Sequence, residues 1–377
     1  MRRGEYMITR NIEYFDLRRI CESGQIFRMY EREDGYFDVF SADRHLRLRQ
    51  QGSRIDFFCS EEDFDGYWRR FFDLDRDYGA IVRGITGQSA CACPDVRDGG
   101  TRDACPDVRD GGKRDTCSDA RDGGKRDTSD IRAGEDDGFL AQACRYGAGI
   151  RILRQDIWEM LISFIISQQK QIPSIRKCIE ALCERFGEKK EDELIEWNTF
   201  PTPQAIAAGG PDGLKGLSLG YRERYIYETA VKYLTDGLPY ETVETMGLDR
   251  AKAYFTSYCG VGEKVANCIC LFGAGYVDAF PIDTHIKDIL YREYYLKEDS
   301  QPEASAERKG QCIKKSGERS AGESAVKTAG LPAGKAYRDH GLTQADYEEL
   351  VRVHFDRFRG YRGIVQQWIF AWELVRG

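Results

Sequence analysis

Two side chains able to do covalent chemistry, Lys264 and Asp283, stand 19 residues apart in the last third of the chain. An unprotonated lysine amine can attack an electrophilic carbon and form a Schiff base. A carboxylate held nearby can stabilise the positive charge that develops in such a transition state. Taken singly, Lys264 would be a solvated helix residue, and Asp283 the cap of a helix that begins near His285.

A glycine hairpin precedes the lysine. The segment Cys259-Gly-Val-Gly-Glu-Lys264 places Gly260 and Gly262 around Val261, between two segments with helical patterns. Such a turn lets backbone N–H groups and a positive helix end approach a phosphate closely. A helix-hairpin-helix holds a DNA backbone without reading its sequence. We therefore interpret Lys264 and Asp283 as a catalytic pair beside a phosphate-binding hairpin.

The nucleophilic role sets a condition on the site. Because only the neutral amine attacks, we expect the site to lower the pKa of Lys264 by desolvation or through neighbouring dipoles. Cys268, one helical turn further on, is either such a dipole or a small core residue.

Composition places these residues in a globular protein with a real core. The chain has 377 residues, 41% hydrophobic and 32% charged, with a net charge of −7. That charge argues against a polyanionic partner, but residues 91–137 hold 13 acidic and 9 basic side chains and account for −4 of it. The apolar runs are too short to cross a bilayer and no export signal is present, so we expect a cytoplasmic protein. The 13 cysteines are odd in number and scattered, which favours reduced thiols and no zinc or iron–sulfur site.

Two biased segments interrupt the chain. From Cys93 a 12-residue unit rich in Asp, Arg and Gly repeats three times, and residues 299–337 are similarly poor in aromatic residues. Neither can bury much apolar surface, so we expect 91–137 to be a disordered insert and 299–337 a low-complexity insert. A calcium-binding solenoid was the alternative for the repeat, but three short copies are too few to build one.

The remaining chain divides into three parts. In residues 1–90, apolar residues alternate at Phe37 and Val39, Leu46 and Leu48, and Ile55 and Phe57, which predicts an antiparallel sheet; a helix around residues 61–75 follows. Residues 138–298 are predicted to be helical, with helices around 157–165, 175–182, 224–234 and 264–272. Residues 338–377 add two helices, near 347–355 and 364–375. The fold class is therefore α+β, with a sheet domain followed by an all-α domain.

The hairpin, Lys264 and Asp283 together resemble the helix-hairpin-helix (HhH-GPD) DNA glycosylase superfamily. The resemblance implies that Lys264 is the nucleophile, whose Schiff base with the sugar allows strand cleavage, and that Asp283 is the family's aspartate. Members similar to endonuclease III carry an iron–sulfur cluster after the aspartate. The only later cysteine in this chain is Cys312, so that branch is disfavoured.

Four further motifs resemble 8-oxoguanine DNA glycosylases and occur in the same order over nearly the whole chain. They are Ser23-Gly-Gln-Ile-Phe-Arg28, Leu153-Arg-Gln-Asp156, Leu219-Gly-Tyr-Arg-Glu-Arg-Tyr225 and Tyr361-Arg-Gly-Ile-Val-Gln366. The resemblance implies that the Gly24 carbonyl accepts the N7–H that distinguishes 8-oxoguanine from guanine. It also implies that Gln366 reads the Watson–Crick edge, while Cys268 and Phe370 enclose the flipped base.

The resemblance also assigns contacts to the DNA. Tyr221 would wedge into the duplex, Arg222 would contact the orphaned strand, and His285 would meet a phosphate. Gln169 occupies the position at which the family has an asparagine that fills the space left by the flipped base. Ser174 occupies the position at which the family has an arginine that reads the orphaned cytosine. These two departures put opposite-base selectivity in doubt.

The sequence thus predicts a monomeric glycosylase and lyase that excises oxidised purine from double-stranded DNA in base excision repair, without a required cofactor. A monovalent cation at the hairpin is left open. The alternatives are another helix-hairpin-helix glycosylase, for alkylpurines or oxidised pyrimidines, and a non-catalytic DNA-binding module. Lys264 counts against an alkylpurine enzyme, and the pocket residues would have no purpose in a binding module.

Overall fold

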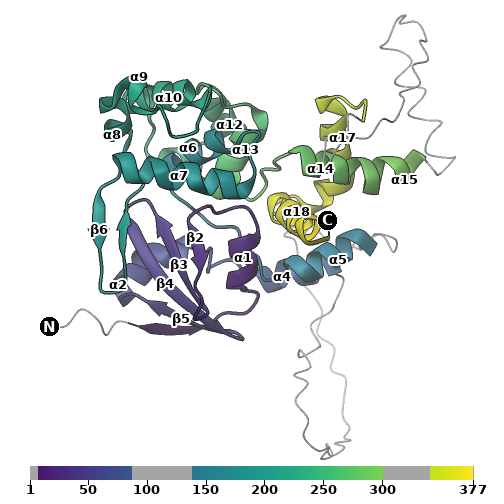
Figure 1. Ribbon diagram of the computed structural model, residues 1–377. Helices are drawn as coiled ribbons and strands as arrows, with labels where there is room; N and C mark the ends of the chain where they lie inside the picture. Colours follow the sequence, from purple (N-terminus) through teal and green to yellow (C-terminus); the bar gives the residue numbers. More distant parts are fainter. Residues whose placement is uncertain (1–6, 87–137, 300–339, 377) are drawn as a thin grey trace, which may run out of the picture.

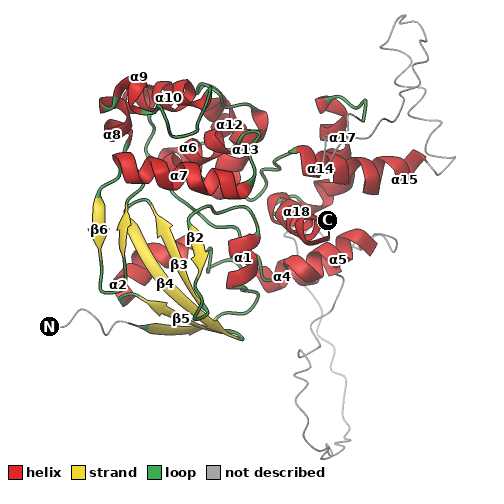
Figure 2. Ribbon diagram, viewed as in Figure 1, coloured by secondary structure: helices red, strands yellow, loops and turns green. Residues whose placement is uncertain are grey.

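The computed structural model describes residues 7–86, 138–299 and 340–376, which form a sheet domain, a helical domain and a set of C-terminal helices (Figures 1 and 2). The sheet has five antiparallel strands in the order β1-β5-β4-β3-β2. They span Ile8–Asn11 (β1), Met29–Glu31 (β2), Tyr36–Ser41 (β3), Arg44–Gln51 (β4) and Arg54–Phe58 (β5). The predicted sheet is therefore confirmed.

The alternation of apolar residues explains the register of the three central strands. Val39 pairs with Leu46, and Leu48 pairs with both Phe37 and Phe57, so the apolar side chains share one buried face. This face is covered by the predicted helix, which the structure divides into α2 (Glu61–Asp63), a π-helical stretch (Phe64–Trp68) and α3 (Arg69–Phe71). The short helix α1 (Leu17–Glu22) packs beside β2.

The helical domain lies against the sheet domain and contains the hairpin (Figure 1). Its main helices are α6 (Ile157–Ser167), α7 (Ile172–Phe186), α10 (Arg222–Asp236), α12 (Leu248–Thr256) and α13 (Glu263–Phe272). Smaller elements complete it: β6 (Lys189–Glu191), β7 (Glu196–Asn198), α8 (Pro203–Ala208), α9 (Gly210–Gly213) and α11 (Tyr240–Thr245). The apolar side chains of α6 are buried all round, which places this helix at the centre of the larger core.

The C-terminal helices complete the molecule and return to the sheet domain. Helix α14 (Thr284–Ile289) continues through a π-helical stretch (Leu290–Tyr295) into α15 (Leu296–Asp299). After residue 340 come α17 (Gln344–Phe355), a short 3-10 turn (Asp356–Phe358) and α18 (Arg362–Arg376). Helix α18 packs against α5 (Gly138–Gly147) and contacts α14, and α4 (Tyr78–Thr86) lies beside α5.

The predicted inserts at 91–137 and 299–337 lie outside the described residues, apart from Asp299, which ends α15. The cysteines within the described ranges are all free thiols. No helix among these residues is long and apolar enough to cross a bilayer.

Buried polar contacts join the sheet domain to the helical domain. Arg28 pairs with Glu180 of α7 at 2.9 Å and donates to the Asn198 carbonyl. Nearby, the Ala42 N–H donates to the buried Glu159 carboxyl of α6 at 2.7 Å. These contacts fix the orientation of the sheet domain on α6 and α7, between which lies the loop that carries Gln169.

Glu159 should make folding stability depend on pH. Burial raises the pKa of Glu159 to about 7, although Arg28 and the Ala42 N–H favour the charged form. The folded protein therefore keeps the Glu159 proton up to about pH 7, whereas the unfolded chain releases it near the ordinary glutamate pKa. The stabilisation of the fold by this bound proton is fully present below the ordinary pKa and is lost as pH rises through about 7. We expect Glu159→Gln to gain about 1–3 kcal/mol relative to the parent protein between pH 5 and pH 8. Urea unfolding of both proteins at the two pH values measures this gain, and an unchanged difference would contradict it.

Candidate functional site

The glycine hairpin joins α12 to α13, as the sequence predicted. Gly260 has φ +78°, and a Cβ at this position would lie 2.4 Å from Cδ2 of Tyr225, so the turn and its close approach to α10 both require glycine. Val261 is buried and its N–H donates to the Tyr258 carbonyl. Gly262 is exposed and precedes α13, whose first turn has no side-chain cap. No side chain caps the N–H groups of this first turn, and their contact with a phosphate stays a prediction.

Replacing Gly260 with alanine should damage the hairpin. The new Cβ would require both a left-handed backbone and displacement of the Tyr225 ring, at a cost of about 1–3 kcal/mol in stability. We expect weaker binding of duplex DNA as well, because the hairpin would move relative to α10. Gly262→Ala is the matched control, since a Cβ there meets open space. Thermal unfolding and duplex-binding titrations measure the effects, and equal results for the two variants would contradict the argument.

Lys264 and Asp283, at the starts of different helices, lie close enough for their charges to interact. Lys264 is in the first turn of α13, half-buried, with its ammonium 5.3 Å from the centre of the Phe164 ring. Its charge interacts with Asp283 and with Cys268, whose side chain is buried one turn further along α13. An amine and a carboxylate are therefore placed in one partly desolvated site.

The pKa of Lys264 differs from the sequence prediction. Burial lowers this pKa, but the Cys268 and Asp283 side chains raise it by more, so the net direction is upward. Burial also raises the pKa of the Cys268 thiol, and Lys264 opposes that effect. The expectation that the site lowers the lysine pKa is therefore wrong for the DNA-free protein. The ammonium must lose a proton before it can act as a nucleophile.

Asp283 has two structural connections. Its carboxylate caps α14 by accepting the Ile286 N–H at 2.8 Å, which is the structural role that the sequence also suggested. The charge of the same carboxylate raises the pKa of Lys264. Helix α14 carries His285, whose ring meets that of Phe370 edge to face, with centroids 5.8 Å apart. Asp283 thus fixes the start of a helix whose first turn borders the predicted base pocket.

The predicted pocket residues Gly24 and Phe370 also come together, from opposite ends of the chain. Gly24 has φ +77°, and a Cβ on it would lie 3.2 Å from Cε1 of Phe370 and 3.6 Å from Cδ1 of Ile172. Gln366, one turn before Phe370 on α18, is 3% exposed, and its Oε1 has no hydrogen-bond partner. A buried acceptor without a partner is costly, which is expected where a ligand supplies the missing donor. That Cys268 faces Phe370 across the base stays a prediction.

Gln169 and Tyr221 occupy exposed positions on neighbouring loops. Gln169 has φ +51°, an uncommon conformation for a residue with a side chain, in the loop between α6 and α7. Tyr221 precedes α10 and is 49% exposed, with its ring packed edge to face on Tyr225. Both side chains are therefore free to enter a duplex.

Arg222 is buried in the DNA-free protein, and its contact with the orphaned strand stays a prediction. It is 6% exposed, and its guanidinium donates to the carbonyl oxygens of Leu219, at 3.0 Å, and Gln168. The group also lies 4.4 Å from the centre of the Tyr221 ring. Through these two donations, Arg222 joins the loops of Gln169 and Tyr221.

Sequence reasoning missed Gln168. Its Nε2 donates to the Gly260 carbonyl at 2.8 Å, and its own carbonyl accepts from Arg222. The residue thereby ties the hairpin to the loops that hold Gln169 and Tyr221. No local pattern distinguishes it from Gln169, the next residue along the chain.

No group of three or more potential metal ligands gathers anywhere in the described ranges. The exclusion of zinc and iron–sulfur sites stays a prediction from the cysteine spacing.

Sequence comparison finds curated relatives that match part of this chain. The chain is 34% identical to "N-glycosylase/DNA lyase" of Saccharomyces cerevisiae over 160 residues, covering 39% of this chain and 43% of the relative. It is 31% identical to an N-glycosylase/DNA lyase of Arabidopsis thaliana over 160 residues, covering 41% of this chain and 43% of the relative. The match thus spans less than half the length of these curated relatives.

Solved structures match over nearly the full length. The structure of MBOgg1 with a low-affinity DNA ligand is similar with a TM-score of 0.69 and 25% identity, covering 98% of this chain and 96% of the other. A Clostridium acetobutylicum 8-oxoguanine glycosylase/lyase bound to double-stranded DNA matches with a TM-score of 0.70 and 22% identity, covering 99% and 96%. The latter likeness shows the fold alone.

Two family models match successive parts of the chain and together cover more than half of it. Residues 7–90 match the 8-oxoguanine DNA glycosylase N-terminal domain, which corresponds to the sheet domain. Residues 162–314 match the HhH-GPD superfamily base excision DNA repair protein and contain the hairpin, Lys264 and Asp283. The chain therefore belongs to the HhH-GPD superfamily of base excision DNA repair proteins, in the group with an 8-oxoguanine DNA glycosylase N-terminal domain.

Proposed function

We propose that this protein is a DNA glycosylase and AP lyase that removes 8-oxoguanine from double-stranded DNA in base excision repair. The observation that carries the proposal is the meeting of Lys264 with Asp283 beside the hairpin. After losing its extra proton, the Lys264 amine attacks C1′ of the extruded nucleotide and the bond from C1′ to the base breaks. The electron pair leaves with the base, which takes up the proton that the new C1′–N bond releases. Asp283 stabilises the positive charge that grows on the sugar as this bond breaks.

The covalent intermediate then supports strand cleavage. Opening of the sugar ring gives a Schiff base between Lys264 and C1′, and loss of a proton from C2′ expels the 3′ phosphate. Hydrolysis of the Schiff base returns the free amine. The amine and the carboxylate supply the nucleophile and the charge that these steps need, so the proposal includes no required cofactor.

The pocket residues are the reason for proposing 8-oxoguanine as the substrate. The unpartnered Oε1 of Gln366 is an acceptor for an N–H on the Watson–Crick edge of a purine. The Gly24 carbonyl would accept from N7–H, which 8-oxoguanine has and guanine lacks. Phe370, which lies against Gly24, would stack on the flipped base.

Borohydride trapping tests the proposal directly. The protein is incubated with a duplex that holds 8-oxoguanine opposite cytosine, and with the same duplex holding guanine, in the presence of borohydride. We expect a covalent adduct with the lesion duplex only. A non-catalytic DNA-binding module would bind both duplexes and give no adduct. An enzyme for alkylpurines or oxidised pyrimidines would show its activity on those bases instead.

The proposed partner is lesion-containing double-stranded DNA, met by the protein as a monomer in the cytoplasm. The net charge of −7 does not oppose this, because phosphates would meet N–H groups at the start of α13 and the His285 side chain.

Selectivity for the opposite base should be modest. Ser174 is exposed in the first turn of α7 but cannot span two acceptors as an arginine would, and Arg222 is engaged within the protein. One good bidentate contact is worth about 1–3 kcal/mol of discrimination, and neither residue supplies one. We expect Ser174→Arg to raise the preference for cytosine over the other bases by about tenfold or more. Single-turnover excision opposite all four bases measures this preference. A preference of about a thousandfold in the parent protein would mean that other residues read the orphaned base.

A further inference from the structure

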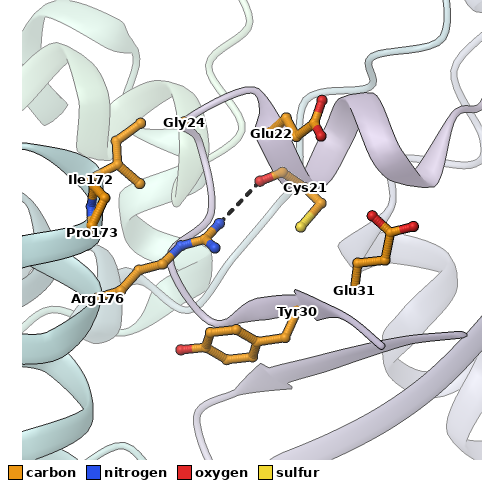
Figure 3. A pocket seen from close by; sticks show the side chains of 8 residues that line it. All are labelled: Cys21, Glu22, Gly24, Tyr30, Glu31, Ile172, Pro173 and Arg176. Carbon is orange, nitrogen blue, oxygen red and sulfur yellow. Dashed lines mark hydrogen bonds between the residues drawn. The ribbon is translucent and has the colours of Figure 1, made fainter. Parts of the chain in front are cut away.

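The turn that carries Gly24 lacks packing on one side. Residues Ser23 to Gln25 follow α1, and Gly24 borders a cavity of about 470 Å³ whose other walls include Tyr30, Ile172 and Arg176 (Figure 3). Close packing normally fixes a buried backbone, but space beside a segment removes that support. The position of the Gly24 carbonyl therefore depends on the hydrogen bonds that hold the turn.

Hydrogen bonds from several parts of the chain hold this turn, and two of them reach Gln25: Gln155 Nε2 donates to its carbonyl at 2.8 Å and the Leu153 N–H donates to its Oε1 at 2.9 Å. The buried Gln25 amide donates to Ser23 Oγ at 3.0 Å and to the Arg151 carbonyl at 2.9 Å. Across the cavity, Arg176 donates to the Cys21 carbonyl at 3.2 Å (Figure 3). From the C-terminal part of the chain, Gln367 Nε2 donates to the Ser23 carbonyl at 2.6 Å. Gln367 is 2% exposed and Ser23 is fully buried, so water has little access to replace this bond.

Gln367 differs from the other anchors because it lies on α18. The preceding residue on this helix is Gln366, with its unpartnered Oε1, and Phe370 follows one turn later against Gly24. A single hydrogen bond thus connects the helix that carries Gln366 to the turn that carries the Gly24 carbonyl. The bond sets the distance between the two groups that would read opposite edges of a purine.

We propose that Gln367 is a positioning residue for lesion recognition, which keeps the Gly24 carbonyl and the Gln366 amide at the spacing of an 8-oxoguanine ring. The inference rests on the proposed function. Gln367 does not touch the base, Lys264 or Asp283 in this role. It acts on base release and has no part in cleavage at a site from which the base is already missing.

Gln367→Met tests the proposal, because methionine has a similar length and no donor. Two rates are measured under single-turnover conditions: base release from a duplex with 8-oxoguanine opposite cytosine, and cleavage of the same duplex with a preformed abasic site. We expect the ratio of the base-release rate to the abasic-site cleavage rate to fall by about tenfold. A tenfold change corresponds to the free energy of one hydrogen bond near the upper end of its usual range. A purely structural loss would lower the active fraction and reduce both rates together.

Trp368→Phe is the matched control. Trp368 Nε1 also donates from α18 to a buried carbonyl, that of Ile150 at 2.9 Å, which lies outside the Gly24 turn. This variant should leave the ratio of the two rates unchanged. If Gln367→Met does not fold, Gln367→Asn makes the same test, because its amide is one methylene too short to keep the 2.6 Å bond.

The outcomes separate the inference from the function on which it rests. Failure of the parent protein to release 8-oxoguanine would overturn the proposed function. Release by the parent with an unchanged ratio in the Gln367 variants would overturn the inference alone. An equal fall in Trp368→Phe would also overturn it, because the effect would then belong to α18 as a whole.

Discussion

Lys264→Gln should abolish base release and borohydride trapping while the protein still binds duplex DNA. Glutamine has no nucleophilic amine, and loss of a covalent nucleophile costs at least about a thousandfold in rate. Binding should persist because the hairpin's phosphate donors are backbone groups at the start of α13 and do not include this side chain. Single-turnover excision, trapping with borohydride and duplex-binding titrations measure the three properties.

Lys252→Gln serves as the matched control for the loss of a cation. Lys252 lies on α12 and pairs with Glu263, the neighbour of Lys264, at 2.6 Å. This variant removes a positive charge close to the hairpin and leaves the proposed nucleophile in place, so trapping should continue. A borohydride adduct retained by Lys264→Gln would place the nucleophile on another residue.

The sequence predicted the central strands because their side chains alternate strictly between a buried and an outer face. It did not predict β1 and β2, which are the two edge strands of the sheet and only four and three residues long. An edge strand has one neighbour and needs little apolar pattern. The β6–β7 hairpin was missed for a related reason, since its short strands are largely charged and partly exposed.

Site residues within one motif could be predicted, whereas their long-range contacts could not. Lys264 and Asp283 stand at a spacing that belongs to the helix-hairpin-helix motif, and the structure brings them together. Arg222 looks exposed in the sequence because it is charged and begins a helix. Its burial depends on the Gln168 carbonyl, 54 residues away. The bond from Gln367 to Ser23 joins residues 344 positions apart, and no local pattern encodes such a contact.

The direction of the Lys264 pKa shift also depends on contacts between residues that are distant in the sequence. A lowered pKa was expected because only the neutral amine is nucleophilic. The sequence placed Asp283 and Cys268 near the lysine, but it could not show that their effect on its pKa outweighs desolvation. The sign depends on distances between three side chains from two helices, which only the folded chain sets.

The two roles of Asp283 can be separated by substitution. Asp283→Asn keeps an oxygen that can accept the Ile286 N–H, so α14 should stay capped, whereas Asp283→Ala should lose about 1 kcal/mol of stability with the cap. Both variants remove the negative charge, and base release should fall by about 10²–10³-fold in each. Because Asp283 raises the pKa of Lys264, its removal should increase the neutral amine and preserve Schiff-base formation at a preformed abasic site. Thermal unfolding, base release and abasic-site trapping measure these effects. An equal loss of trapping and base release in Asp283→Asn would show that the carboxylate acts by positioning or deprotonating Lys264, and not by stabilising charge on the sugar.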